Sequence, residues 1–215
     1  MVKNHSIALV SFDLDGTILH GRIMYHLRVP ADLRKKIAAQ DVLYDRGRQS
    51  YEDALRVQYS LLEGMRPDEI APDPCELPLI KDLGTAIQEL KRSHVRVVIL
   101  TDNPSFAAEP LKSFGFDDII GSEIAIFNGL LGKTRTLLTD KLIGLREYCH
   151  KIGIQIACCA HIGDWVNDIV VFKGVGVSVA LNPSDDEVSK AASFCVRSDS
   201  LLDVLRVLQP FLQNR

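Results

Sequence analysis

Two carboxylates, Asp13 and Asp15, stand at the end of a run of mostly apolar residues that begins at Ile7. Such a run is typical of a strand that is buried on both faces of a parallel sheet. Residues i and i+2 of an extended segment point to the same side, so both acids can face one reaction centre. Because open α/β sheets hold their ligands at the carboxyl ends of the strands, the pair predicts a catalytic edge. The alternative is that the two acids only cap the next helix.

A second acidic pair, Asp164 and Asp168, follows a strand predicted for residues 156–162. These acids are four residues apart across a turn into a helix, and they reach the same edge of the sheet as Asp13. Carboxylate oxygens are hard ligands that suit Mg²⁺. Without a cation the three acids would repel one another and shift toward protonation. Their convergence implies a bound metal, and we predict Mg²⁺.

Polar residues at two further positions are suited to hold an anion. Thr101 closes a strand predicted for residues 95–100, and Asp102 and Asn103 follow it. A hydroxyl and free backbone N–H groups at the start of a helix can bind phosphate, although a plain helix N-cap explains Thr101 equally well. Lys141 stands at the start of a predicted helix, where the helix dipole disfavours a cation. This placement fits a lysine that reaches an anionic centre, although surface lysines are common.

The elements that must position these residues alternate between strand and helix from Leu77 onward, which predicts a doubly wound parallel α/β sheet. The predicted strands are 7–13, 95–100, 156–162, 175–181 and 194–196, and the predicted helices are 79–93, 105–114, 139–152, 167–172, 184–192 and 201–212. A short two-stranded excursion over 124–131 has Asn128-Gly129 as its hairpin turn.

Residues 20–74 break this alternation. They contain no convincing strand, and apolar side chains such as Leu55 and Tyr59 recur at helical spacing. An all-helical insertion directly after the first strand would lie over the carboxyl edge of the sheet as a lid. We therefore predict an α/β core formed by residues 1–19 and 75–215, and a helical cap formed by residues 20–74.

The composition is that of an ordinary globular protein, with 47% hydrophobic and 25% charged residues. A net charge of −3 argues against nucleic acid as a partner. No apolar run reaches the length of a membrane span and the start lacks a signal peptide, so we expect a cytoplasmic protein. Five cysteines without Cys-x-x-Cys spacing predict neither a disulfide framework nor a zinc knuckle. Cys158, Cys159 and His161 fit a buried strand better than a metal site, because neighbouring strand residues point to opposite faces.

Taken in chain order, these groups of residues closely resemble the four motifs of the haloacid dehalogenase superfamily. The groups are Asp13-Leu14-Asp15-Gly16-Thr17, Thr101, Lys141 and Gly163-Asp164-x-x-Asn167-Asp168. The helical insertion resembles the first type of cap of that superfamily. Further stretches are similar to its phosphoserine phosphatase branch, namely Tyr51-Glu52-Asp53-Ala54-Leu55, Ser60-Leu61-Leu62 and the Asn128-Gly129 hairpin. The resemblance covers nearly the whole chain.

The resemblance implies Mg²⁺-dependent phosphoryl transfer through an aspartyl-phosphate. Asp13 would attack phosphorus, since a carboxylate can carry a phosphoryl group covalently. Asp15 would protonate the leaving oxygen and later deprotonate the attacking water. Thr101 and Lys141 would hold and neutralise the equatorial phosphate oxygens.

The same resemblance implies a ligand set for the metal and for the phosphate. Mg²⁺ would be bound by Asp13, by the backbone carbonyl of Asp15 and by Asp164, with Asp168 either a direct ligand or one step removed. Asn167 is expected to orient Lys141 or a phosphate oxygen. Further candidates for binding phosphate or substrate are Gly16, Thr17, Asp102 and Asn103.

We expect the substrate to differ from phosphoserine, because the residues that bind its amine and its carboxylate in the phosphoserine branch are replaced here. In that branch an acid after the first motif binds the substrate amine and a cap arginine grips the carboxylate, but here these places hold Arg22 and Gln58. A phosphoserine zwitterion would keep unpaired charges in a closed site. We predict another small phosphorylated metabolite. Most cap arginines are expected to be solvated, whereas Arg22 and Arg56 are the best placed to contact an anionic or hydroxylated leaving group, and Trp165 would narrow the entrance.

The sequence therefore predicts a phosphatase for a small phosphomonoester, acting as a monomer or a homodimer. A phosphomutase or phosphotransferase would use the same residues and pass the phosphoryl group to a sugar hydroxyl. A protein phosphatase and a non-catalytic module that binds a phosphate ligand are further alternatives. Dehalogenation does not fit Asp15 and Asp164, because the metal-free dehalogenases of the superfamily lack the second acid of the first motif.

Overall fold

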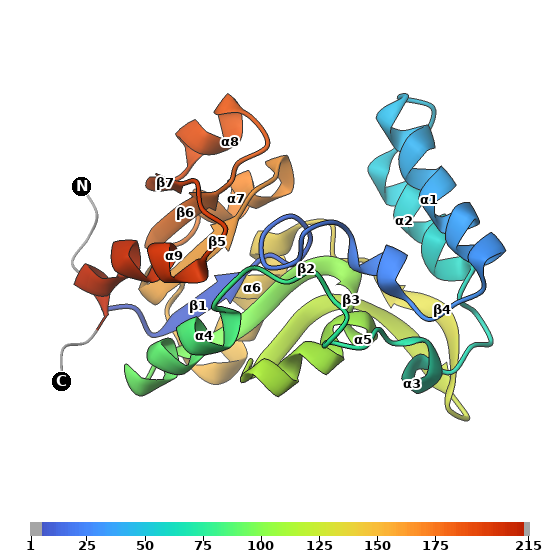
Figure 1. The fold of residues 1–215 in the computed structure, drawn as a ribbon, viewed down its shortest axis with the longest axis horizontal. Coiled ribbons are helices and arrows are strands. Elements are labelled where there is room, and N and C mark those ends of the chain that lie inside the picture. Colours follow the sequence, from blue (N-terminus) through green and yellow to red (C-terminus); the bar gives the residue numbers. More distant parts are fainter. Residues whose placement is uncertain (1–5, 213–215) are drawn as a thin grey trace.

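The computed structural model describes residues 6–212, in which seven strands form one sheet (Figure 1). The strand order is β4-β3-β2-β1-β5-β6-β7; β4 is antiparallel to β3, and all other neighbours are parallel. The strands are β1 (Leu9–Phe12), β2 (Arg96–Pro104), β3 (Asp118–Phe127), β4 (Leu130–Thr136), β5 (Cys159–Gly163), β6 (Val177–Leu181) and β7 (Phe194–Val196). The predicted α/β class with a parallel sheet is confirmed.

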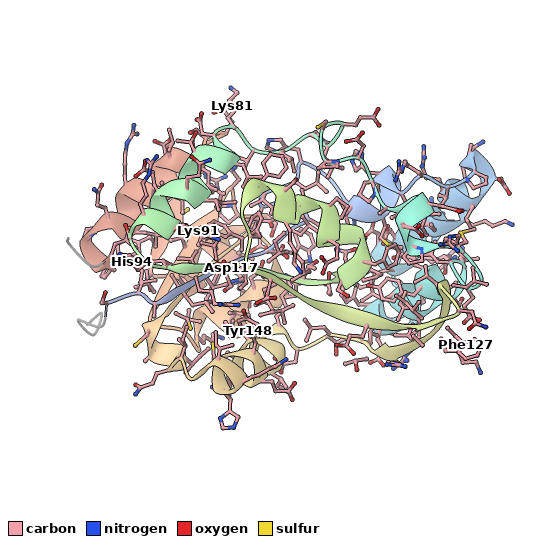
Figure 2. All side chains as sticks on the ribbon, turned by 90° about the horizontal axis from the view of Figure 1, so that it is seen from below. Lys81, Lys91, His94, Asp117, Phe127 and Tyr148 are labelled. Carbon is pink, nitrogen blue, oxygen red and sulfur yellow. The ribbon has the colours of Figure 1, made fainter. Side chains whose placement is uncertain are left out.

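Helices cover both faces of this sheet, as Figure 2 shows edge-on. α4 (Leu83–Arg92), α5 (Ser105–Ala108) and α9 (Leu201–Leu208) pack into the larger hydrophobic cluster, whereas α6 (Lys141–Ile152) and α7 (Ile169–Phe172) pack into a cluster on the opposite face. α8 (Asp186–Ala191) packs near α7. α4 illustrates why these segments are helical, since its buried residues recur three and four positions apart and form one apolar stripe.

β1 lies at the centre of the sheet, between β2 and β5. All four of its residues are buried, and Phe12 is in register with Ile99 of β2 and Ile162 of β5. A strand buried on both faces is mostly apolar, which explains the run in the sequence, and its one polar residue, Ser11, is buried with a hydrogen-bond partner in His161. The register aligns the carboxyl ends of the three central strands, so the polar residues that follow them meet at one edge.

The helices between β1 and α4 form a separate group on the same side as that edge. A 3₁₀ turn (Ile23–His26) leads into α1 (Ala31–Asp45), α2 (Tyr51–Ser60) and the short α3 (Pro67–Ile70), and no strand lies within residues 20–74. α1 and α2 pack side by side and project from the sheet near β4 (Figure 1). The chain leaving α2 is joined to β4, because Gly64 N donates to Leu131 O at 2.7 Å and Leu131 N donates to Met65 O at 2.8 Å. We keep residues 20–74 as the proposed cap. The two ends of the proposed core, residues 1–5 and 213–215, lie outside the described residues.

Several predicted boundaries differ from the observed ones. β3 begins at Asp118 and joins the parallel sheet beside β2, whereas the sequence predicts only the excursion over 124–131. Its first half is only partly buried and carries polar residues, so hydrogen bonds to β2 rather than an apolar pattern define it. The predicted helix 105–114 ends as an α-helix at Ala108 and continues as a 3₁₀ helix around Pro110, which lacks the N–H that an α-helix needs.

Two further features concern the surface and the helices of the described chain. Phe127 lies at the tip of the β3–β4 hairpin, at the end of the molecule opposite His94 (Figure 2), and its side chain is 76% exposed. Within residues 6–212 we find no helix with the length and apolar character that crossing a membrane requires.

Candidate active site

Asp13 follows β1 directly and is buried beside the first residue of α6, Lys141. Lys141 Nζ donates to Asp13 Oδ1 at 2.7 Å and to Asp168 Oδ1 at 2.8 Å. The second oxygen of Asp13, Oδ2, has no hydrogen-bond donor within the described chain, and Asp13 lines a cavity. One carboxylate oxygen of Asp13 is therefore fixed by a cation, and the other is available to a ligand.

Burial and neighbouring charges set the protonation of this group. Burial raises the pKa of Asp13, and Lys141 opposes this rise while Asp168 and Asp164 add to it. Burial lowers the pKa of Lys141, but the two acids outweigh it and the net pKa is raised. For Asp168, Lys141 and His161 outweigh the effect of burial, so its pKa is lowered. Lys141 is thus held as a cation and Asp168 as an anion.

Asp15 lies two residues beyond Asp13 and receives two uncharged donors. Ile23 N donates to Oδ1 at 2.8 Å, and Asn103 Nδ2 donates to Oδ2 at 3.0 Å. Burial raises the pKa of Asp15 to about 7 despite these hydrogen bonds. A carboxyl group with a pKa near neutrality is suited to both donate and accept a proton.

Asp164 follows β5 and is held by the first motif. Thr17 Oγ1 donates to Asp164 Oδ1 at 2.6 Å, and burial raises the pKa of Asp164 to about 6. Gly16 packs against the same carboxylate, since an added Cβ would lie 2.2 Å from Asp164 Oδ2. Gly16 also has a φ of +83°, so glycine is required there for both space and backbone conformation.

The donor set of this edge fits a hard divalent cation. One oxygen each from Asp13, Asp164 and Asp168 lies within 4.8 Å of the others, and these three form the only such group among residues 6–212. Three buried carboxylates beside one lysine leave an excess of negative charge that oxygen-ligated Mg²⁺ would neutralise.

The three acids differ in what they can offer to a metal. Asp168 Oδ1 accepts from Lys141 and from His161, and Oδ2 accepts from the backbone N of Asp164 and of Trp165, each at 3.1 Å. A carboxylate has about four acceptor sites, so donors occupy all those of Asp168. Asp13 and Asp164 each keep an oxygen without a donor in the described chain. Asp168 is therefore placed to orient Lys141 and the loop after β5.

The residues after Leu100 form hydrogen bonds that the sequence did not predict. Thr101 Oγ1 accepts from Asn103 Nδ2 at 2.9 Å, and the same amide nitrogen supports Asp15. Asn167 was expected to orient Lys141 or a phosphate oxygen, but its Nδ2 donates to Asp102 Oδ2 at 2.9 Å. Asn167 Oδ1 is buried without a partner among the described residues. The side-chain amide of Asn167 therefore contacts Asp102 rather than Lys141.

A cavity of about 240 Å³ is lined by the core acids and by the cap. The cap contributes Arg22, Tyr44 and Tyr51, and Trp165 lies on the core side. Arg56 does not line this cavity; it is exposed on α2 and pairs with Glu52 at 2.6 Å. Of the two cap arginines singled out in the sequence, the structure brings only Arg22 to the site.

A buried hydrogen-bonded link beneath Asp168 was not predicted from the sequence. His161 lies in β5 and is fully buried, with Nε2 3.1 Å from Asp168 Oδ1 and Nδ1 2.9 Å from Ser11 Oγ. Burial lowers the pKa of His161, although Asp168 opposes this effect. A neutral ring must then donate from Nε2 to the carboxylate and accept from Ser11 at Nδ1. Ser11 and His161 are in register, two residues before Asp13 and Gly163, and strand alternation could have identified them.

Comparisons with known proteins agree with this arrangement. A family model described as haloacid dehalogenase-like hydrolase matches residues 10–173. A phosphoserine phosphatase of Halobacterium salinarum is 28% identical over 184 residues, which cover 82% of this chain and 87% of the relative. Phosphoserine phosphatase SerB2 of Mycobacterium tuberculosis is 27% identical over 93% of this chain, which spans 50% of that relative. A solved structure of substrate-bound phosphoserine phosphatase has a TM-score of 0.75 at 20% identity, covers 94% of this chain and 98% of its own, and shares the fold.

Proposed function

The chain belongs to the haloacid dehalogenase-like hydrolase family and is a phosphoric monoester hydrolase similar to phosphoserine phosphatases, and on this basis we propose its reaction. The reaction is Mg²⁺-dependent hydrolysis of a small phosphomonoester through an aspartyl-phosphate at Asp13. The observation that carries the proposal is the environment of Asp13: its Oδ1 is fixed by Lys141, its Oδ2 is without a donor in the described chain, and it lines the same cavity as Asp15, whose pKa burial raises to about 7.

In the first step Asp13 Oδ2 forms a bond to phosphorus and the bond from phosphorus to the leaving oxygen breaks. Asp15, with its pKa of about 7, donates a proton to that oxygen. In the second step Asp15 takes a proton from a water molecule, whose oxygen attacks phosphorus while the bond to Asp13 breaks. Inorganic phosphate is released and both acids return to their starting state.

The other residues of the edge stabilise charge and hold the metal. Lys141 and the Thr101 hydroxyl neutralise and bind the phosphoryl oxygens. Asp164 and the oxygen of Asp13 that does not attack phosphorus would hold Mg²⁺, with the Asp15 carbonyl as a further ligand, and Asp168 orients Lys141. Bound Mg²⁺ supplies positive charge to the oxygens on which the transition state concentrates negative charge.

The proposal is tested by phosphate release from p-nitrophenyl phosphate with and without Mg²⁺. We expect turnover that chelation abolishes and added Mg²⁺ restores, and we expect Asp13→Asn to lose turnover while keeping its circular dichroism spectrum. A mutase would hydrolyse this ester poorly, and a binding module would not hydrolyse it at all. The Asp13→Ser variant controls for packing, because it retains a small polar group but cannot replace the carboxylate. Unchanged turnover in Asp13→Asn would reject the mechanism.

Other properties stay predictions from the sequence. These are the cap boundaries, cytoplasmic location, a state of monomer or homodimer, and a small phosphorylated metabolite as substrate without nucleic acid or membrane as partner. Sedimentation of the purified chain separates the monomer from the dimer.

A further inference from the structure

Asp102, which follows Thr101 in β2, keeps one carboxylate oxygen without a hydrogen-bond partner. The residue is only 7% exposed and lines the cavity. Both side-chain donors reach the same oxygen, since the Tyr51 hydroxyl donates to Oδ2 and Asn167 Nδ2 donates to Oδ2 at 2.9 Å. Asp102 Oδ1 has no donor among residues 6–212, and unlike Asn167 Oδ1 it is not sealed from solvent. This oxygen is therefore open to a hydrogen-bond donor on a ligand.

The negative charge of Asp102 also has no counterpart in the described part of the chain. Lys141 is bound to two of the three carboxylates that fit the metal, and Arg22, the only basic residue of the lining, pairs with Asp41 at 3.0 Å. The two donors to Asp102 are a neutral hydroxyl and a neutral amide. Because buried charges in proteins are normally paired, a cation on the ligand would complete this site.

Aromatic side chains line the same cavity. The rings of Tyr44 and Tyr51 lie 5.2 Å apart between centroids, and Trp165 lies on the core side of the lining. Tyr51 is the residue whose hydroxyl contacts Asp102, so its ring lies beside the open carboxylate oxygen. The faces of tyrosine and tryptophan rings attract cations, including organic ammonium groups. Carboxylate and rings thus favour the same kind of ligand group.

The cavity limits the size of that group. Its volume of about 240 Å³ is small for a ligand site. Asp102 directly follows Thr101, which is proposed to bind a phosphoryl oxygen, so a group bound at Asp102 is joined to the phosphate by few atoms. A leaving group of a few carbon atoms with a positive nitrogen fits these limits.

We propose that Asp102 Oδ1 accepts a hydrogen bond from a primary ammonium group of the leaving group, so that the substrate is the phosphomonoester of a short amino alcohol. This inference rests on the proposed function and names its substrate class. The acceptor comes from β2, whereas in the phosphoserine branch the acid that binds the amine follows the first motif. The ammonium group is recognised here without any requirement for a carboxylate beside it.

Binding to the Asp13→Asn variant in Mg²⁺ tests the proposal without turnover. Isothermal titration calorimetry would compare O-phosphoethanolamine with 2-hydroxyethyl phosphate, which has a hydroxyl in place of the ammonium group and is otherwise the same. We expect O-phosphoethanolamine to bind at least about tenfold more tightly, since a hydrogen bond between two charged groups is stronger than one from a neutral hydroxyl.

An Asp102→Asn variant in the same background locates the preference. Its side-chain oxygen can still accept from Tyr51 and Asn167, but its NH₂ group then takes the place of the open oxygen. The ratio of the two affinities should fall by about tenfold, to one or below. Glu52→Gln is the matched control, since this acid lies on α2 outside the cavity lining, and the ratio should not change. Circular dichroism verifies that each variant is folded.

The outcomes separate this inference from the proposed function. Equal affinities, or tighter binding of 2-hydroxyethyl phosphate, would overturn the inference with Asp102 intact, so this result does not depend on the folding of Asp102→Asn. A ratio that Asp102→Asn leaves unchanged would also overturn it. The proposed function fails in a different assay, if the unmodified chain with Mg²⁺ releases no phosphate from either ester or from p-nitrophenyl phosphate.

Discussion

The carboxylates at the carboxyl edge of the sheet differ in proton affinity because their neighbours differ. Asp168 is buried, yet Lys141 and His161 outweigh burial and lower its pKa. Asp15 is partly buried at the cavity and receives only the uncharged donors Ile23 N and Asn103 Nδ2, so loss of solvent raises its pKa to about 7. The difference gives Asp168 a permanent charge and leaves Asp15 free to exchange a proton.

The protonation of Asp15 predicts how the rate depends on pH. Asp15 holds its proton below about 7 and loses it above, so kcat/KM for an alkyl phosphate should fall as the pH rises through about 7. The phosphorylation step with p-nitrophenyl phosphate should not show this fall, because nitrophenolate leaves without a proton. Asp15→Asn should lower kcat for the alkyl ester by roughly 10²–10⁴-fold. Burst and steady-state kinetics across this pH range provide the measurement, and identical profiles for both esters would contradict the role.

Gly16→Ala should damage the metal site because the new Cβ would collide with Asp164 and the backbone has a positive φ. We expect a loss of about 1–3 kcal/mol in the free energy of unfolding and a higher Mg²⁺ concentration for half-maximal rate. Urea denaturation and Mg²⁺ titration measure the two effects. Gly47→Ala is the control, since its φ is +64° but nothing lies within 4 Å; it should report strain alone and leave the Mg²⁺ dependence unchanged.

The sequence predicted which segments form the site but not which side chains pair with one another there. The apolar strands that end in acids predicted which segments meet, because the carboxyl ends of parallel strands lie at one edge. The partners of those side chains depend on distances across the fold. Asn167 pairs with Asp102 rather than Lys141 across 65 positions of the chain, which no spacing rule could anticipate, whereas the pairing of Arg56 with Glu52 follows the i,i+4 spacing of a helix and could have been predicted.

Among the elements, β1 and β5 are joined beneath the site by side chains as well as by backbone. Ser11 and His161 lie in register, and His161 passes its hydrogen bond on to Asp168. The sequence predicted both strands from their apolar character but predicted β5 from residue 156, where the structure has a 3₁₀ turn (Ile156–Cys158). Periodicity identifies a buried segment but not the residue at which its backbone becomes extended.

Removal of the hydrogen bond between His161 and Asp168 should lower the free energy of unfolding. His161→Leu leaves one acceptor of a buried, ionised Asp168 without its donor, and we expect a loss of about 1–3 kcal/mol in the free energy of unfolding. Ser11→Ala removes the contacts of the Ser11 hydroxyl with His161 and with Ala160 O but leaves Asp168 its donor, so it should cost less. Urea denaturation of the two variants orders the effects. Equal stability of His161→Leu and the unmodified chain would show that Asp168 does not depend on the imidazole.

At the scale of the whole molecule, the cap and the core share one hydrophobic cluster, and polar contacts at Asp102 add to it. Tyr51 of α2 donates to the Asp102 side chain and Tyr59 donates to the Asp102 backbone oxygen at 2.6 Å. The sequence predicted a helical cap from the absence of strands, but it could not predict these contacts, because they join residues about 50 positions apart across two packed groups. Asp102 is therefore both a cavity residue and the anchor of the cap.

Loss of one anchor should loosen the cap. Tyr51→Phe removes a hydrogen bond worth about 0.5–1.5 kcal/mol, so amide hydrogen exchange in α1 and α2 should become faster and KM should rise. Mass spectrometry of exchanged peptides provides the measurement. Tyr148→Phe is the control, since this tyrosine lies on α6 and bonds to Arg96 and Asp118 (Figure 2). If both variants exchange alike in α1 and α2, the contact does not restrain the cap.

The first residue of the cap's 3₁₀ turn, Ile23, donates its backbone N–H to Asp15. The segment that follows α2, at Gly64 and Met65, is hydrogen-bonded to Leu131 of β4. Rotation of the cap about these hydrogen bonds to β4 would move the Ile23 N–H away from Asp15. Opening would remove a donor that favours the ionised carboxylate, but it would also admit water, and burial is the larger cause of the raised pKa, so the pKa of Asp15 would fall while the cap is open. Closure of the cap would restore the raised pKa, so that Asp15 is a proton donor near neutral pH only while the cavity is closed.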